Sequence, residues 1–170
     1  MKKRFLLIID GMTGSGKTTA AMLLSKHFPR VAIIGMDKVK RFISDFKRGE
    51  RDNLIAREII FEMTRKYFEH NIAVILDQSF KSDKELKLYE KLAHKYSFPI
   101  YKVQLYTTPK LAMERVQFRQ QDWANKIPEE RIKRNISLFK NKQEDGFIVI
   151  DTTKISSKKV VNKILKLFNS

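Results

Sequence analysis

Cysteine is absent from the 170-residue sequence, and its absence excludes disulfide bonds, thiolate metal sites and cysteine nucleophiles. Long apolar runs are also absent, because none approaches the roughly 20 residues that a membrane-spanning helix needs. The basic N-terminal start is followed by only about five apolar residues before Asp10, fewer than the roughly 7 to 15 of a signal peptide. We therefore expect a cytoplasmic protein with no membrane partner.

Acidic residues are scarce relative to basic ones. The chain has 19 aspartates and glutamates against 35 lysines and arginines, which gives a formal net charge of +16. Such a charge favours a polyanionic partner such as RNA or DNA, but the basic residues are scattered along the whole chain, so a solvated lysine-rich surface explains it equally. The length is typical of a single domain, and we expect residues 1–170 to form one.

Short apolar runs alternate with segments of helical spacing, which is typical of an α/β protein with a parallel sheet covered on both faces. We expect strands at residues 5–9, 31–36, 72–76, 100–106 and 147–150. We expect helices at residues 17–28, 37–46, 54–68 and 83–98, and from about residues 109, 128 and 157 onward. Asn71 is predicted to cap the end of the third helix, and Ser82 and Ser156 are predicted to cap the start of two others.

The segment GMTGSGKT matches G-x-x-x-x-G-K-[ST] at every fixed position, between a predicted strand and a predicted helix. Backbone N–H groups of such a loop surround phosphate oxygens, and the helix N-terminus adds partial positive charge. Lys17 is expected to bridge the β- and γ-phosphates, and the Thr18 hydroxyl is expected to ligate Mg²⁺. The predicted nucleotide-binding residues are Gly11, Met12, Thr13, Gly14, Ser15, Gly16, Lys17, Thr18 and Thr19.

Three further residues are candidates for the chemistry of phosphate transfer. Asp77 ends an apolar strand and is expected to hold Mg²⁺ beside the threonine of the motif, although a turn or cap role is the alternative. Arg115 and Arg119 lie one helical turn apart and suit clamping of nucleotide phosphates in the transition state. The alternative for both arginines is a basic surface that pairs with Glu114 or Asp122.

These motifs resemble those of the small P-loop kinases, in the group that contains the polynucleotide kinase domain and the chloramphenicol phosphotransferase-like and zeta-toxin-like kinases, with an AAA-type ATP-binding kinase domain. The resemblance rests on residues 11–18, on IIGMD, on VILDQS and on LAMERVQFR, and it covers nearly the whole chain. It implies a P-loop NTPase three-layer sandwich with strand order 2-3-1-4-5. It also implies ATP as the phosphate donor and a mobile lid at about residues 119–128.

The resemblance assigns the acceptor side of the site to the segment after the second strand. It implies that Asp37 is the general base on the acceptor hydroxyl, although its position also suits a helix N-cap. Polynucleotide kinases often carry an arginine where this chain has Lys40 followed by Arg41, and we expect these two residues to bind the acceptor. Phe80 replaces an asparagine common in polynucleotide kinases, and Gln78 argues against a thymidylate kinase.

We therefore predict an enzyme that uses ATP and Mg²⁺ to phosphorylate a hydroxyl, with the 5′-hydroxyl of RNA or DNA as the preferred acceptor. A small metabolite, nucleotide or antibiotic is the alternative acceptor. A non-catalytic nucleotide switch or ATPase module is an alternative of another class, against which an acid at Asp37 argues. Trp123 lies in the predicted lid and suits either stacking on a base or packing. Asp10 is assigned no chemistry beyond orienting the loop.

Overall fold

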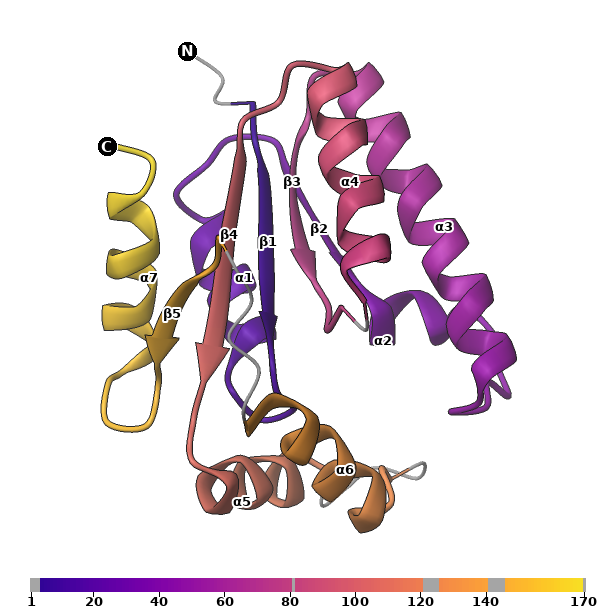
Figure 1. The fold of residues 1–170 in the computed structure, drawn as a ribbon, viewed down its shortest axis with the longest axis vertical. Coiled ribbons are helices and arrows are strands. Elements are labelled where there is room, and N and C mark those ends of the chain that lie inside the picture. The colour runs from indigo at the N-terminus through magenta and orange to yellow at the C-terminus, as the bar shows by residue number, and fades with distance from the viewer. Residues whose placement is uncertain (1–3, 81, 121–125, 141–145, 170) are drawn as a thin grey trace.

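A five-stranded parallel sheet lies at the centre of the computed structural model, which describes residues 4–80, 82–120, 126–140 and 146–169 (Figure 1). The strands follow the order β2-β3-β1-β4-β5, and neighbouring strands pair in parallel. The predicted α/β class and strand order are therefore confirmed. The strands are β1 (Leu6–Gly11), β2 (Val31–Gly35), β3 (Ala73–Asp77), β4 (Ile100–Tyr106) and β5 (Ile148–Asp151).

The central strand β1 explains why helices cover both faces of the sheet. Its first four residues are apolar and fully buried, and successive side chains of a strand point to opposite faces. Leu6 and Ile8 accordingly belong to one hydrophobic core, and Leu7 and Ile9 belong to the other. Removing each such side chain from water contributes roughly 1.5–3 kcal/mol, and this requires a layer of helices on each face.

Two pairs of helices form these outer layers. One face is covered by α3 (Glu50–Glu69) and α4 (Asp83–Lys95), and the other by α1 (Lys17–Ser25) and α7 (Ser157–Lys166). Figure 1 shows α3 and α4 to the right of the sheet and α7 to its left, whereas α1 overlaps β4 and β1 in this view. The predicted three-layer sandwich is therefore confirmed. Within the described ranges, no helix combines the length and the apolar character needed to cross a membrane.

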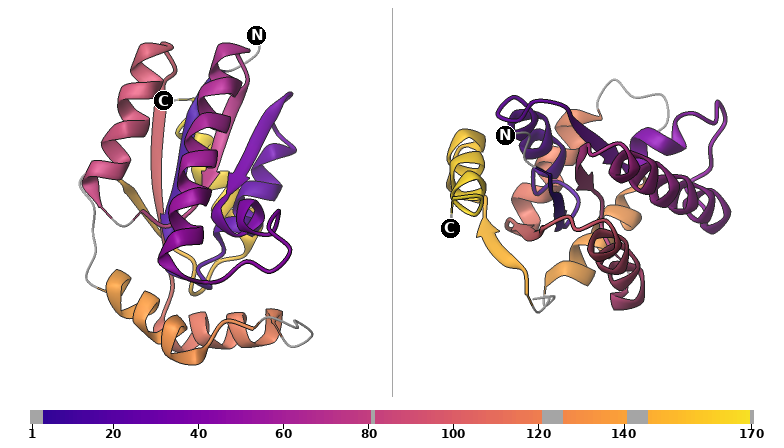
Figure 2. Two further views of the ribbon diagram at one scale, coloured as in Figure 1. Left: turned by 90° about the vertical axis from the view of Figure 1, so that its right-hand side faces the viewer. Right: turned by 90° about the horizontal axis from the view of Figure 1, so that it is seen from above.

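The remaining helices lie at the carboxyl end of the sheet. They are α2 (Met36–Lys40), α5 (Pro109–Arg119) and α6 (Glu129–Lys140), and Figure 2 shows α5 and α6 crossing below the ends of the strands. These two helices share an apolar cluster with a residue of the loop that follows β1, so that loop is packed against them. The buried members of the cluster are Met12, Ala112, Val116, Ile132, Ile136 and Phe139.

Three helices end earlier than the sequence pattern predicts. Helices α1 and α4 each end three residues early, at Ser25 and Lys95, and α2 ends at Lys40 rather than Phe46. After Lys40 the chain forms turns in which the N–H of Phe42 bonds to the carbonyl of Val39, and that of Ile43 to the carbonyl of Lys40, each at 3.1 Å. Such bonds to the third preceding residue are tighter than an α-helical turn, and they begin the loop that leads to α3.

Hydrogen bonds and a backbone angle confirm the three predicted capping residues. The Ser82 hydroxyl accepts a bond of 3.3 Å from the N–H of Glu85, and the Ser156 hydroxyl accepts one of 3.4 Å from that of Lys159. Asn71 adopts a left-handed φ of 55° just after α3, as expected of a residue that terminates a helix. These residues mark where α4 and α7 begin and where α3 ends.

Candidate active site

The loop between β1 and α1 carries the predicted phosphate-binding motif. Gly14 lies so close to α5 that a Cβ atom there would be 2.4 Å from the carbonyl oxygen of Ala112. Gly16 adopts a left-handed φ of 98°, and no atom lies within 4 Å of where its Cβ would be. Open space therefore borders the backbone at the start of α1, where N–H groups of a helix N-terminus bind phosphates.

Side chains from distant parts of the chain hold this loop in place. The carboxylate of Asp10 accepts a hydrogen bond of 2.6 Å from the N–H of Gly11, and the Ser79 hydroxyl donates one of 2.9 Å to the carbonyl of Gly11. The side-chain oxygen of Asn135, on α6, accepts a bond of 2.7 Å from the N–H of Thr13. Asp10 thus orients the loop as expected, whereas the contacts of Ser79 and Asn135 were not predicted.

A cleft of about 370 Å³ opens beside this loop and brings most of the predicted site residues together. Its walls come from α1, α2, α3, β3, α5 and α6. Four predicted residues do not line it: Gly11, Met12, whose side chain is in the apolar cluster, Ser15, which is buried, and Arg115, which borders another cavity. Those that do are Thr13, Gly14, Gly16, Lys17, Thr18, Thr19, Asp37, Lys40, Arg41, Asp77 and Arg119.

The ammonium group of Lys17 lies over the loop. It donates hydrogen bonds of 2.7 and 2.9 Å to the carbonyl oxygens of Gly11 and Met12. Burial lowers the pKa of this ammonium, and the negative charge of nearby carboxylates, that of Asp77 most strongly, opposes the shift. The carboxylates of Asp77, Asp10 and Asp37 thus lie near enough to Lys17 to favour its charged form.

Thr18 and Asp77 form a possible set of ligands for Mg²⁺. Both line the cleft, Thr18 from the first turn of α1 and Asp77 from the end of β3. A hydroxyl and a carboxylate are the hard oxygen ligands that Mg²⁺ prefers, and the ion usually completes its shell with water and substrate phosphates. Among the described residues, no group of three or more acidic, histidine or cysteine side chains could hold a metal, so these residues suit an ion shared with a nucleotide.

Asp37 lies in the first turn of α2, and its side chain is 55% exposed. Its carboxylate is 3.3 Å from the ammonium of Lys40 and 3.9 Å from the guanidinium of Arg48. Burial acts to raise the pKa of Asp37, but the positive charges of Lys40 and Arg48 outweigh it and hold the pKa below its ordinary value. Asp37 is therefore a carboxylate at neutral pH, directed into the cleft that Lys17 also lines.

Lys40 is turned inward rather than toward the outside of the cleft. Its side chain is only 6% exposed, and its ammonium donates a hydrogen bond of 3.2 Å to the side-chain oxygen of Asn53 on α3, besides its ion pair with Asp37. Burial lowers the pKa of Lys40, while Asp37 opposes this shift. The structure thus gives Lys40 two protein partners, and its expected contact with the acceptor stays a prediction.

The two arginines of α5 occupy different environments. Arg115 donates hydrogen bonds to the carbonyl and hydroxyl oxygens of Thr152, at 3.1 and 3.3 Å, and to the carbonyl of Gly14 at 3.4 Å. It borders a second cavity of about 160 Å³ together with Ser15, and it does not line the main cleft. Arg119 does line the main cleft. The two arginines predicted to clamp phosphates therefore differ in position. Arg119 lines the main cleft, whereas Arg115 is hydrogen-bonded to Gly14 and Thr152.

Helix α6 contributes cleft residues that the sequence analysis missed. Arg131 and Asn135 both line the cleft and lie four residues apart, on a different side of α6 from the buried Ile132 and Ile136. That spacing of polar residues beside an apolar stripe was visible in the sequence. The part of the predicted lid that contains Trp123 lies outside the described residues.

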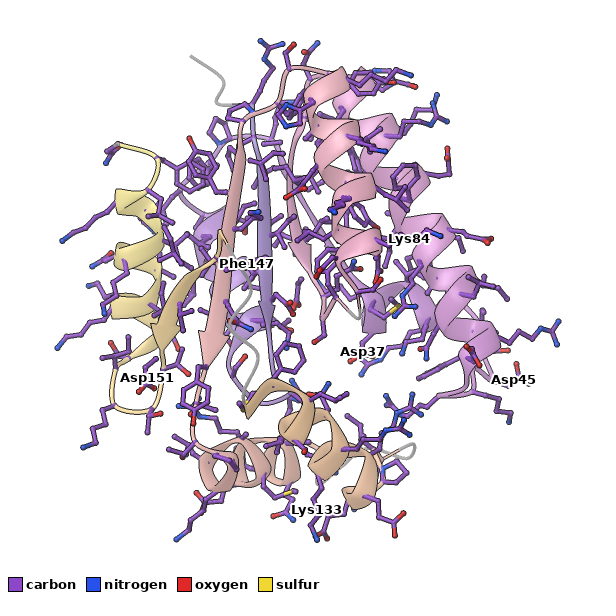
Figure 3. The ribbon with its side chains drawn as sticks, viewed as in Figure 1. Asp37, Asp45, Lys84, Lys133, Phe147 and Asp151 are labelled. Carbon is purple, nitrogen blue, oxygen red and sulfur yellow. The ribbon has the colours of Figure 1, made fainter. Side chains whose placement is uncertain are left out.

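Positive charge dominates the cleft. Figure 3 shows side-chain nitrogen atoms in the space between Asp37 and α6, the helix that carries Lys133. Among the described residues that line the cleft, basic side chains outnumber carboxylates by seven to two. The basic residues are Lys17, Lys38, Lys40, Arg41, Arg57, Arg119 and Arg131, and the acidic ones are Asp37 and Asp77.

Comparison with known proteins agrees with this architecture. Residues 6–141 match the protein family described as AAA domain. The chain belongs to that family. A comparison with curated proteins finds no match.

Solved structures share the fold of this AAA-domain chain at low sequence identity. A proposed kinase from Chloroflexus aurantiacus is 18% identical, with a TM-score of 0.78 over 99% of this chain and 98% of that one. The APS kinase of Mycobacterium tuberculosis, in complex with AMPPNP and APS, is 13% identical, with a TM-score of 0.72 over the whole of both chains. A chain of the Pnkp1/Rnl/Hen1 RNA repair complex is 18% identical, with a TM-score of 0.66 over 82% of this chain and 45% of that one. The family match and these structures confirm the expected AAA-type domain and its fold.

The division between the two arginines predicts different effects on stability. We expect Arg115→Ala to lower the free energy of unfolding by about 1–3 kcal/mol, because it removes charged hydrogen bonds to Thr152 and Gly14. Arg119→Ala, on an exposed side of the same helix, is expected to change it by no more than about 0.5 kcal/mol. Urea unfolding of both variants checks this, and equal losses would contradict the structural role of Arg115.

The lowered pKa of Asp37 predicts a pH-dependent contribution to stability. As the pH falls, the unfolded chain protonates Asp37 before the folded protein does, so the ionised group stabilises the fold above its ordinary pKa of 3.8. We expect the difference in free energy of unfolding between the wild type and Asp37→Asn to be constant from pH 7 to about pH 5 and to shrink as the pH falls through the lowered pKa. Urea titrations at several pH values measure it, and a difference that grows on acidification would show that the sign is wrong.

Proposed function

We propose that the protein transfers the γ-phosphate of ATP to a hydroxyl group of an acceptor. The observation that carries this proposal is that Lys17, Asp77 and Asp37 line one cleft. The first two are of the types that phosphate-binding loops use for a nucleotide and its magnesium ion. The third residue, Asp37, is an ionised acid, and the binding of a nucleotide does not require it. A non-catalytic nucleotide switch has no use for this acid, so Asp37 favours an enzyme.

In the proposed reaction the loop and the ammonium of Lys17 hold the β- and γ-phosphates. Mg²⁺ at Thr18 and Asp77 would neutralise charge on the phosphate oxygens. Asp37 accepts the proton of the acceptor hydroxyl while its oxygen bonds to the γ-phosphorus. The bond from the γ-phosphorus to the bridging oxygen breaks, and ADP leaves with that electron pair. Arg119 would stabilise the charge on the group in transfer.

The preferred acceptor in this proposal is the 5′-hydroxyl end of RNA or DNA. The next phosphate along such a strand lies within one nucleoside of the reacting hydroxyl, and the seven basic side chains of the cleft suit that anion. The formal net charge of +16 favours the same class of partner. A chain of the RNA repair complex has the same fold, which supports an acceptor of this class.

A small anionic metabolite is the second candidate. The cleft volume of about 370 Å³ is close to the lower end of the roughly 300–1,000 Å³ of small-molecule sites, and part of it must hold the donor phosphates. The APS kinase with the same fold is a precedent for a small acceptor. The excess of basic side chains still requires that this metabolite be an anion.

An acceptor screen tests the proposal. We expect transfer of radiolabel from γ-labelled ATP to at least one of a panel of 5′-hydroxyl oligonucleotides and anionic metabolites. Lys17→Ala should reduce that transfer by roughly 100-fold or more, since it removes a transition-state contact. For an oligonucleotide, the acceptor KM should also rise steeply with salt, because binding releases counterions. A folded Lys17→Ala variant with normal transfer would contradict the assignment.

Separate roles for the two aspartates give a sharper prediction. Asp37→Asn should abolish transfer and leave the affinity for Mg²⁺-ATP within roughly threefold, because this acid meets the acceptor rather than the metal. Asp77→Asn should instead weaken Mg²⁺-dependent ATP binding. Calorimetric titration of ATP with and without Mg²⁺ measures both. If Asp37→Asn lost Mg²⁺-ATP binding and Asp77→Asn kept it, the two roles would have to be exchanged.

A further inference from the structure

Basic residues that are scattered along the sequence are unevenly divided between the two helical layers of the fold. Helices α3 and α4 together carry eight basic and eight acidic residues, which gives that layer no net charge. Helices α1 and α7 together carry five basic residues and no acidic one. Both layers belong to the same chain, so a generally lysine-rich composition does not explain the difference between them.

Helix α7 presents its positive charge on the side that faces away from the sheet. Its apolar stripe packs into the core, and the buried members of that stripe are Val160, Val161 and Ile164. Lys159, Lys163 and Lys166 recur at intervals of four and three residues, which places them along one side of the helix. All three are exposed, and Figure 1 shows α7 at the left edge of the molecule.

Neighbouring segments extend this basic surface. Lys26 and Arg30 are exposed in the segment that follows α1. That segment contacts the chain just after α7, because the ring centroids of Phe28 and Phe168 lie 4.9 Å apart. We define the basic face as the exposed lysines and arginines of α7 and of these flanking segments. They are Lys26, Arg30, Lys154, Lys158, Lys159, Lys163 and Lys166.

The charge of the basic face is little compensated by the protein. Within the described ranges, none of its seven residues has a carboxylate oxygen within the 4 Å of an ion pair. Asp151 is the one acid on which these residues act measurably. Hydrogen bonds from Thr153 lower the pKa of Asp151 most, and the charges of Lys154 and Lys163 lower it further. A surface of this kind attracts a polyanion.

The residue types on the basic face favour nucleic acid over a membrane or an acidic protein. A helix that binds a membrane surface inserts apolar side chains, whereas those of α7 are directed into the core. Within α1 and α7, which the structure describes completely, Met22 is the one large apolar side chain that is exposed. Lysine is depleted in protein–protein interfaces, but it neutralises the phosphates of nucleic acids.

We propose that the basic face binds the phosphate backbone of RNA or DNA outside the cleft and without regard to base sequence. None of its residues lines the cleft. The ten residues of α7 extend about 15 Å, which matches about four phosphates of one strand at roughly 3.4 Å each. The inference does not rest on the proposed kinase function, because the basic face would hold a strand whether or not that strand accepts phosphate.

Fluorescence anisotropy with a labelled, 5′-phosphorylated single-stranded oligonucleotide tests the basic face in the absence of ATP. The variant Lys159→Gln/Lys163→Gln/Lys166→Gln should bind this probe about 10-fold or more weakly at low salt. The slope of log affinity against log salt should become shallower by about 2, since each lost phosphate contact removes about 0.7. Circular dichroism checks that the variant is folded.

A matched control removes the same charge from the opposite layer. Lys84, Lys87 and Lys91 are exposed on α4, and Figure 3 shows Lys84 on the far side of the sheet from α7. The variant Lys84→Gln/Lys87→Gln/Lys91→Gln should bind the probe within roughly twofold of the wild type, because its net charge falls without a change to the basic face.

Three results would overturn the proposal. Equal losses of affinity in the two variants would mean that net charge alone governs binding. An α7 variant that binds as tightly as the wild type would mean that the strand occupies the cleft instead. An α7 variant that loses binding only to vesicles containing phosphatidylserine would mean that the partner is a membrane. The probe is not a phosphate acceptor, so failure of the kinase proposal would leave this test unaffected.

Discussion

Backbone hydrogen bonds between β1 and its parallel neighbours, β3 and β4, align residues that are far apart in the sequence. Ile9 is in register with both Asp77 and Val103, so the glycine-rich loop begins next to the carboxylate that ends β3. A slip of one residue would exchange the side chains of β1 between the two cores, and burial on both faces prevents it. The donor half of the cleft is therefore a consequence of strand register rather than of attraction among its own polar side chains.

The charges around Asp37 bear on how such an acid could act. Lys40 and Arg48 keep its pKa low, which makes Asp37 a weak base. Phosphoryl transfer commonly passes through a loose transition state in which the attacking oxygen is little bonded, so it needs limited proton removal before attack. In the proposed reaction, Asp37 would contribute mainly by orienting the hydroxyl and accepting its proton late. The same positive charges keep the carboxylate ionised over the whole neutral range.

The sequence was sufficient to locate a site residue where a local motif or apolar run determines its position in the fold. The loop motif located Lys17 and Thr18, and the apolar run before Asp77 located that carboxylate at a strand end, because both signals are local. The sequence was insufficient where tertiary packing determines the environment of a side chain. Lys40 is buried because Asn53 of another helix accepts its hydrogen bond, and no local pattern encodes that pairing. The polar spacing of Arg131 and Asn135 was visible in the sequence, but only the packing of α6 at the end of the sheet places these residues in the cleft.

Helix α6 contacts both halves of the cleft. Asn135 bonds to the loop at Thr13, and Arg131, one turn earlier, bonds to the carbonyl of Arg48. A ligand that displaces either contact changes the free energy of the helix position, and the other contact experiences the same change. Thermodynamic linkage is reciprocal, so whatever factor nucleotide binding applies to acceptor affinity through α6, acceptor binding applies to nucleotide affinity. In the proposed reaction, a nucleotide and an acceptor that both act on α6 would each change the affinity for the other by the same factor.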